Sequence, residues 1–303
     1  MNIVLPIAGV SEQVLVLLAL GGIVGFLSGV FGVGGGWLMT PLLIFIGVPP
    51  TFAVAASANQ LVGASVAGTI AQWRRGNIDL AMAMVLLAGG IAGSILGVWV
   101  FSLLRRVGQV ELFISIAYVV MLGSLGAFML TESARAILFK PKEVRRKLHQ
   151  HNFLHGLPFK MRFRRSKLYI SAIVPVAIGF AGGFLSAVMG VGGGFLMVPA
   201  MIYLLDMPVA LVPGTSLFQI IFVAASVTVL QAYQNGTVDI VLALLLLLGG
   251  VVGVQLGTRV GARLKGEYFR AILGLLVLAT AAKLFGDLTI TPQDLYSLEL
   301  RAP

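Results

Sequence analysis

The sequence predicts an all-α polytopic membrane protein that contains two copies of one helical unit. Of its 303 residues, 58% are hydrophobic and 11% are charged, whereas an ordinary soluble domain has about 45–50% apolar and about 25% charged residues. A glycine-rich block near residue 30 occurs again near residue 190. This composition excludes a soluble globule and a disordered chain, and the absence of cysteine excludes disulfides and zinc–thiolate sites.

Stretches without charged residues define the expected membrane spans. A transmembrane helix needs about 20 mostly apolar residues, and each span must be helical because the bilayer interior cannot hydrate free backbone groups. The leucine run at 242–248 also lacks the alternation of a transmembrane β-strand. The longest stretches without Asp, Glu, Lys or Arg are 13–73, 80–104, 112–131, 168–205, 207–238 and 240–258.

Two similar blocks indicate an internal repeat. Residues 25–41 read GFLSGVFGVGGGWLMTP and residues 183–199 read GFLSAVMGVGGGFLMVP, with thirteen of seventeen positions identical. The match continues, with short insertions, through polar residues and glycines that chance would not easily align. The aligned pairs include Ser57 with Ser216, Gln60 with Gln219, Asp79 with Asp239, Gly89-Gly90 with Gly249-Gly250, and Gly93 with Gly253.

Each copy is expected to form five helical pieces. The second piece has only about 12 residues, or about 18 Å at 1.5 Å per residue, and is too short for a hydrocarbon core of about 30 Å. We therefore expect a broken or re-entrant helix after each Gly-rich turn, and about 8–10 transmembrane segments in all. The expected pieces are 13–31, 36–47, 51–73, 79–103 and 110–131 in the first copy, and 169–189, 194–205, 209–233, 239–262 and 268–286 in the second.

Four regions follow from the repeat and the charge pattern. The segment between the copies holds eleven of the 21 Lys and Arg residues, which are retained on the cytoplasmic side of a membrane. This places both termini on the periplasmic side and the two repeats in opposite orientations, which is typical of secondary transporters. Arg105-Arg106 falls outside and argues against this orientation. The regions are a first membrane repeat (1–131), a basic cytoplasmic loop (132–168), a second membrane repeat (169–287) and an acidic C-terminal tail (288–303).

The Gly-rich turns are the candidate anion site. Glycine lets backbone N–H groups approach a ligand closely, and the short helix after each turn directs its positive end to the same place. The alternative is helix packing through small residues, which a single block would favour. Two blocks, each before a helix too short to span, favour the anion site. The predicted substrate-binding glycines are Gly34, Gly35, Gly36, Gly192, Gly193 and Gly194.

The third helix of each copy adds hydrogen-bonding side chains. Polar residues at membrane depth usually face the bundle interior or a water-filled path, so we expect them to bind substrate oxygens. The alternative is hydrogen bonding between helices without a ligand, worth about 0.6 kcal/mol per contact. Ser28 and Ser186, one turn before the Gly-rich blocks, are weaker candidates. The predicted substrate-binding side chains are Ser57, Asn59, Gln60, Thr215, Ser216 and Gln219.

The titratable residues indicate structure more than chemistry. Asp79 and Asp239 each precede an apolar run, where Asp is a preferred helix N-cap, so we expect capping in place of proton coupling. No predicted span contains a His to activate a nucleophile or a cluster of metal ligands. The sequence therefore predicts no enzyme activity, no metal and no cofactor. The only histidines are His149, His151 and His155, all in the basic loop, where solvation is the expected state.

The paired GFLS-x-x-x-GVGGG-x-x-x-x-P blocks resemble the TauE/SafE sulfite exporter family. The turns at 76–79 and 236–239 and the stretch HGLPFKMRFRRSKLYIS at 155–171 fit the same family. The resemblance covers residues from about 20 to about 287 and implies a carrier for sulfite, organosulfonates or related small organic anions in a bacterial inner membrane. Our own hypothesis is alternating access, in which one repeat bundle rocks against the other around the paired Gly-rich turns. The expected partners are a small anion and the lipid bilayer, and no nucleic acid is expected because the basic charge lies in one loop. An anion channel, or a non-catalytic assembly or sensor subunit, is the alternative, and the oligomeric state stays open.

Overall fold

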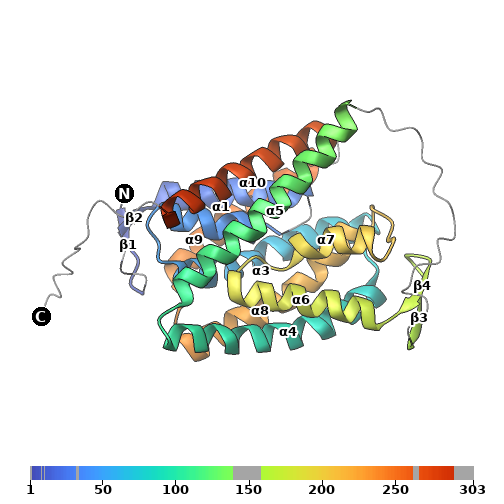
Figure 1. Ribbon diagram of the computed structural model, residues 1–303, viewed down its shortest axis with the longest axis horizontal. Helices are drawn as coiled ribbons and strands as arrows, with labels where there is room; N and C mark the ends of the chain where they lie inside the picture. The colour runs from blue at the N-terminus through green and yellow to red at the C-terminus, as the bar shows by residue number, and fades with distance from the viewer. Residues whose placement is uncertain are drawn as a thin grey trace, which may run out of the picture. The chain divides into compact units, whose positions relative to one another are not determined.

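The structure is a computed structural model that describes residues 2–7, 9, 11–31, 34–138, 158–261 and 266–289 (Figure 1). These residues form ten α-helices and two short β-hairpins, so the predicted all-α class is confirmed. Gly32, Val33, the three histidines and most of the acidic tail lie outside the described residues. The helices are α1 (Val14–Phe31), α2 (Gly36–Phe45), α3 (Pro50–Arg74), α4 (Leu80–Arg106), α5 (Val110–Leu138), α6 (Ile173–Met189), α7 (Gly194–Tyr203), α8 (Val212–Asn235), α9 (Ile240–Gly261) and α10 (Gly266–Thr289).

Five helices in the described part of the chain are long and apolar enough to cross a membrane. They are α3, α4 and α8, with the apolar parts of α5 and α9. The short helices α2 and α7 have 10 residues each and contain Pro41 and Pro199. At 1.5 Å per residue, a helix of this length covers only about half of a hydrocarbon core of about 30 Å.

The chain forms two compact units. The first unit contains α1–α4 and α6–α9, and the second contains most of α5 together with α10. Within the second unit, α5 and α10 approach each other through glycines. A Cβ atom on Gly126 would lie 2.6 Å from Leu278 Cγ, and one on Gly274 would lie 3.1 Å from Met129 Cβ. The two helices of this unit therefore pack closely against each other.

In the first unit, each repeat packs one of its helices along a helix of the other. α1 packs along α9, and the equivalent helix α6 packs along α4. A Cβ atom on Gly25 would overlap the carbonyl oxygen of Gly250, and one on Gly183 would overlap that of Gly90. The backbones of both pairs are therefore in direct contact, which is how membrane helices gain van der Waals attraction. The other glycines in these two interfaces include Gly21, Gly29, Gly249, Gly253 and Gly257, and Gly89, Gly93, Gly97 and Gly179.

Helices α3 and α8 connect these two pairs. They contact each other, and they also contact α9 and α4, respectively. α3 and α8 run in opposite directions, because Gly68 of α3 lies against Leu217 near the start of α8, and Gly214 lies against the Asn77 backbone. The equivalent central helices of the two copies are therefore antiparallel neighbours.

Each repeat begins with a β-hairpin. Strands β1 (Asn2–Val4) and β2 (Ser11–Gln13) pair before α1, and strands β3 (Lys160–Phe163) and β4 (Leu168–Ser171) pair before α6. Asn2 pairs with Gln13 and Lys160 pairs with Ser171, so both registers are related by the offset of 158 that relates the Gly-rich blocks. Residues 160–168 lie in the segment expected to be the basic loop, because that prediction depends on its many Lys and Arg residues.

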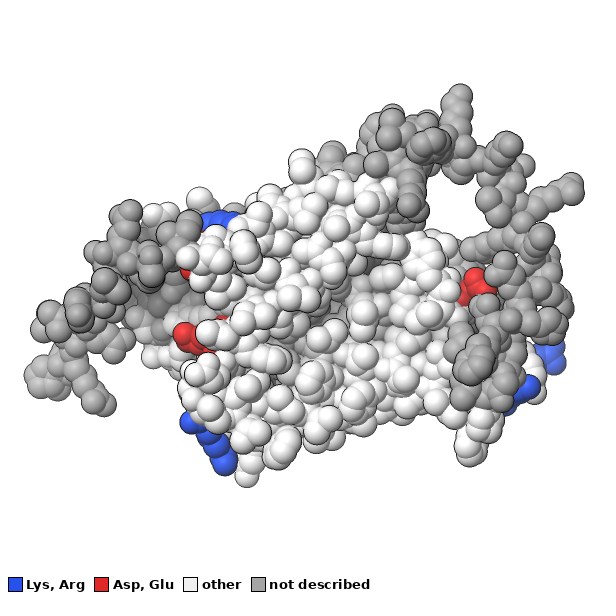
Figure 2. All heavy atoms as spheres, in the orientation of Figure 1, with Lys and Arg blue, Asp and Glu red and all other residues white. Residues whose placement is uncertain are grey.

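The two hairpins lie at opposite ends of α4 and α9. At one end, Arg165 of the β3–β4 hairpin donates to the Ile78 carbonyl and Arg75 donates to the Thr258 carbonyl, at 2.8 Å and 3.2 Å. At the other end, Arg105 donates to the Asn235 carbonyl. Between Asp79 and Arg105, α4 carries no charged side chain, and its exposed surface appears uncharged in Figure 2. This distribution suits helices whose middle portions contact lipid.

Candidate functional site

The two Gly-rich turns lead directly into the short helices. Gly35 is the N-cap of α2 and Gly193 is the N-cap of α7, and neither cap has a side-chain hydrogen bond. The backbone is left-handed at Gly34 (φ +76°), at Gly190 (φ +72°) and at Gly193 (φ +70°), a conformation that L side chains rarely adopt. The sequence can form these turns because glycine occupies each such position. The N–H groups of a first helical turn have no partner inside the helix.

The two turns meet, although 158 residues separate them in the sequence. A Cβ atom on Gly36 would overlap the Gly190 carbonyl oxygen and would lie 3.0 Å from the Val191 carbonyl carbon. Immediately after the turns, the rings of Trp37 and Phe195 lie 5.7 Å apart. These aromatic residues occupy matched positions in the two blocks. The N-terminal ends of α2 and α7 therefore converge on one buried place in the first unit.

Two matched apolar side chains fill the space beside the turns. Leu61 Cδ1 lies 2.6 Å from the Cβ positions of both Gly36 and Gly192, and Ile220 Cδ1 lies 3.4 Å from that of Gly34. Leu61 and Ile220 align in the repeat and are both fully buried. They therefore pack directly on the glycine backbone. Sequence patterns missed this pair, because apolar residues carry no signal in so apolar a chain.

The hydroxyl groups of the candidate set make hydrogen bonds within the protein. Ser57 donates to the Ala53 carbonyl at 2.7 Å and accepts from Thr40 Oγ1 at 2.8 Å. Ser216 donates to the Pro213 carbonyl at 3.1 Å. Thr215 donates to the Leu211 carbonyl at 2.7 Å and accepts from the Asp79 backbone N–H at 3.0 Å. Thr215 therefore holds the start of α4.

Thr40 is a polar residue of the Gly-rich region that the sequence patterns did not single out. Besides its bond to Ser57, its hydroxyl lies 3.2 Å from the Met189 carbonyl, just before the second Gly-rich turn. It also lies 3.1 Å from the Cβ position of Gly190. A Thr within the otherwise apolar α2 was the available signal. It was overlooked because Val198 occupies the matched position.

Gln60 and Gln219 are fully buried, and neither end of either side-chain amide has a hydrogen-bond partner. Gln60 Nε2 lies 2.5 Å from the Cβ position of Gly250, and Gln219 Nε2 packs equally tightly against Gly90. These contacts are equivalent, since both the glutamines and the glycines align in the repeat. An unsatisfied buried amide is costly, and one that occurs twice requires an explanation.

Other polar residues of the candidate set occupy distinct surroundings. The hydroxyl groups of Ser28 and Ser186, which are also matched, are buried without a hydrogen-bond partner. Asn59 is half-buried on α3. Its counterpart Phe218 packs near Trp73, with ring centroids 6.5 Å apart. The pairs Gln60 with Gln219 and Ser28 with Ser186 therefore share their environments, whereas Asn59 has no polar equivalent.

Asp79 and Asp239 cap helices, as predicted. Asp79 Oδ1 accepts from the Met82 N–H at 3.2 Å at the start of α4. Asp239 Oδ1 accepts from the N–H groups of Val241 and Leu242 at the start of α9, at 3.0 Å and 3.2 Å. Both carboxylates are almost fully buried. Within the described residues, no three His, Asp or Glu side chains are grouped as in a metal site.

Comparison with known proteins identifies the family. Residues 17–284 match the family model described as sulfite exporter TauE/SafE. The chain is 28% identical to the probable membrane transporter protein YjnA of Bacillus subtilis over 268 residues, which cover 88% of this chain and 98% of that protein. It is 30% identical to a probable membrane transporter protein of Xylella fastidiosa over 274 residues, covering 89% and 94%. No solved structure matches the chain significantly. The chain therefore belongs to the TauE/SafE family of membrane transport proteins.

Proposed function

We propose that this protein is a secondary transporter that moves sulfite, organosulfonates or related small organic anions across the bacterial inner membrane. The observation that carries this proposal is the meeting of the two Gly-rich turns, where Gly36 touches Gly190. Membership of the TauE/SafE family and relatives named as probable membrane transporters support the class of function.

The anion is held by backbone groups in this proposal. The N-terminal ends of α2 and α7 carry a partial charge of about +0.5 each, and their free N–H groups donate hydrogen bonds to anionic oxygens. Neither helix contains Lys or Arg, so the backbone supplies the positive potential. The substrate-contacting glycines are Gly34, Gly35, Gly36, Gly192, Gly193 and Gly194.

Substrate entry requires Leu61 and Ile220 to move. Both side chains pack on the Gly-rich turns in this structure, which we interpret as a closed state. We propose that the two repeats are inverted and that the α1–α9 and α4–α6 pairs move as rigid bodies in alternating access. The antiparallel contact of α3 with α8 supports this arrangement.

We propose that the buried glutamines bind substrate oxygens or water when the substrate path opens. In the closed state, neither Gln60 nor Gln219 has a side-chain hydrogen-bond partner. The Gln60 amide lies where α3 contacts α9, and the Gln219 amide lies where α8 contacts α4. Separation of these helices would admit a substrate oxygen or water to the amides. We propose the same secondary role for Ser57, Ser216, Asn59 and Thr215, whose hydroxyl and amide groups lie on α3 and α8.

Transport by purified protein in liposomes tests the proposal. We expect saturable uptake of labelled sulfite or a small sulfonate, with competition by unlabelled anion. A Gly36→Ala variant that folds normally should lose uptake, since a methyl group there overlaps the Gly190 carbonyl. Rates far above carrier turnover with a linear current would indicate a channel instead. Absence of flux for every anion tested would favour an assembly or sensor subunit.

A further inference from the structure

The two structurally equivalent hairpins carry opposite charge. The β3–β4 hairpin has no acidic residue, whereas the β1–β2 hairpin has Glu12 and no Lys or Arg. The hairpins lie at opposite ends of the first unit. Their difference in charge therefore distinguishes two ends that have the same backbone structure. The cations of the β3–β4 hairpin are Lys160, Arg162, Arg164, Arg165 and Lys167.

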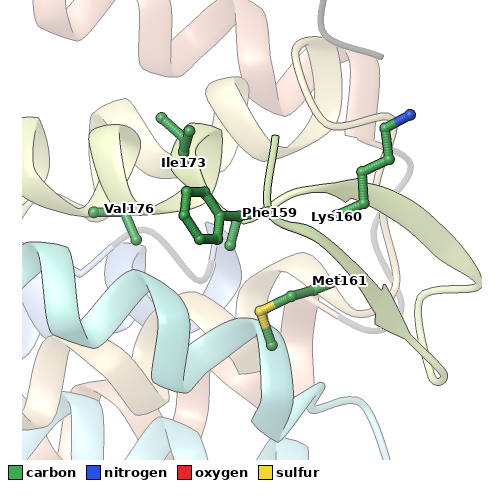
Figure 3. A pocket seen from close by; sticks show the side chains of 6 residues that line it. Phe159, Lys160, Met161, Ile173 and Val176 are labelled. Carbon is green, nitrogen blue, oxygen red and sulfur yellow. The ribbon is translucent and has the colours of Figure 1, made fainter. Parts of the chain in front are cut away.

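An open apolar groove lies beside the basic hairpin. It has a volume of about 410 Å³ and lies between the start of β3 and the start of α6. Figure 3 shows Phe159, Ile173 and Val176 close together along one side, with Lys160 extending away from them. Phe159 is 77% exposed and has a left-handed backbone (φ +61°). The chain thus presents a large apolar ring to its surroundings at a backbone conformation that costs energy for a bulky residue.

The groove is preformed because several bonds fix the hairpin. Ser166 donates through its N–H and its hydroxyl to Asp79 Oδ2, at 2.9 Å and 2.5 Å. The Ala172 N–H donates to the Phe159 carbonyl at 3.0 Å, which joins the hairpin to α6. Arg165 donates a hydrogen bond to the Ile78 carbonyl, which also holds the hairpin in place. Lys160 and Arg162 are exposed, and neither side chain is held by a hydrogen bond to the described part of the bundle. Both can therefore reach a ligand beside the groove.

We propose that this groove binds an anionic phospholipid of the adjacent leaflet. One acyl chain packs against Phe159, Met161, Ile173 and Val176, and the phosphate is held by Lys160 and Arg162. An exposed apolar groove at the end of a membrane helix suits an acyl chain, and each Lys or Arg near the surface favours an anionic headgroup. The charge contrast with the β1–β2 hairpin makes the site specific to one side of the membrane.

Lipid retention by the full-length protein tests the site. The purified protein is incubated in neutral detergent with phosphatidylglycerol or phosphatidylcholine, and bound lipid is counted by native mass spectrometry. We expect preferential retention of phosphatidylglycerol. The double variant Lys160→Gln/Arg162→Gln should lower that preference by about fivefold or more for each cation removed. Arg106→Gln, an exposed cation at the other end, is the charge control and should leave the preference unchanged.

A second matched pair tests the groove itself. Ile173→Trp fills the groove and should lower retention of both lipids. Leu15 is the equivalent exposed position after the other hairpin, at the offset of 158, so Leu15→Trp should leave lipid retention unchanged. Both residues are exposed, so neither change disturbs the core. Equal retention of the two lipids by the unmodified protein would overturn the proposal. Retention unaffected by Ile173→Trp, or equally reduced by Leu15→Trp or Arg106→Gln, would also overturn it.

Discussion

Asp79 joins the start of α4 to the second repeat, because its Oδ2 atom accepts two hydrogen bonds from Ser166, 87 residues further along the chain. Asp239 makes the equivalent connection at the other end, where its Oδ2 accepts from the Ile7 N–H at 2.9 Å. Each aspartate therefore caps the fourth helix of one copy and fastens the hairpin that precedes the first helix of the other. Ser166 was not recognised from the sequence, since a serine in a basic segment gave no indication of a partner.

We expect Asp79→Ala to destabilise the protein by about 2 kcal/mol or more. The change removes an N-cap, worth about 1 kcal/mol, and leaves the buried Ser166 without its charged acceptor. Thermal unfolding should show a lower Tm, and limited proteolysis should begin in the β3–β4 hairpin. Asp239→Ala should lower the Tm similarly, with cleavage before α1 instead. Unchanged stability together with abolished transport would indicate that Asp79 acts in coupling.

We expect Gly36→Ala to reduce transport strongly, since the new methyl group overlaps the backbone of the opposite turn. The matched control is Gly123→Ala in α5, where an added Cβ meets nothing within 4 Å. Alanine at this helical position should be neutral or slightly stabilising. Transport is measured in liposomes at equal amounts of folded protein. Equal activity of the two variants would reject a role for the turn.

We expect Leu61→Ala and Ile220→Ala to weaken closure over the Gly-rich turns. Removing a fully buried leucine or isoleucine usually costs about 2–5 kcal/mol, so both variants should have a lower Tm. They should also raise passive leak of small anions through the protein. Leu244→Ala, an exposed position on α9, controls for general loss of apolar surface. A lower Tm without any change in leak would mean that the pair only stabilises the fold.

We expect Gln60→Leu and Gln219→Leu to stabilise the closed protein while slowing transport. Each replaces a buried amide that has no side-chain hydrogen-bond partner, which should relieve a cost of about 1–3 kcal/mol. The same change removes a group that would hydrate or bind substrate in the open path. Tm and initial transport rate are measured on the same preparations. A fall in both would show that these amides support the closed fold.

The chain lacks cysteine, so its orientation can be tested with single cysteine variants. Arg74→Cys and Arg106→Cys place exposed thiols at opposite ends of the bundle. If the basic segment is cytoplasmic, a membrane-impermeant maleimide added to intact cells should label Arg106→Cys and spare Arg74→Cys. Labelling both after lysis confirms that each thiol is accessible. The reversed pattern would place the lipid groove and Arg74 on the outer side.

The sequence predicted the helices better than their contacts. Charge-free stretches, divided at glycines and prolines, located nine of the ten helices in the described residues, because desolvated backbone leaves few alternatives in a membrane. The tenth, α10, was expected from the apolar stretch 268–286, which contains Arg270 and Lys283. The duplicated glycines also predicted the two short helices α2 and α7. The start of α8 was expected at 209 but lies at Val212, because Asp206 and Pro208 belong to the preceding turn, in which Asp206 is left-handed.

The side-chain arrangement around the turns depended on tertiary packing. Leu61, Ile220 and Thr40 meet the turns only after α2, α3 and α8 assemble. Matched positions in the repeat drew attention to Ser57 and Gln60, yet their environments differ, since Ser57 is bonded and the Gln60 amide is not. Residue type and spacing could not distinguish these two cases.

The reciprocal packing of α1 with α9 and of α6 with α4 has a consequence for biogenesis. The glycine surface of α1 meets its partner only after more than 200 further residues have been synthesised. During translation, the glycine surface of α1 therefore stays uncovered in the bilayer until α9 has been synthesised. The packing of α1 on α9 is thus a late step of folding. Either repeat expressed without the other would lack the opposing backbone and should be degraded. Co-expression of the two repeats should restore the amount of each in the membrane.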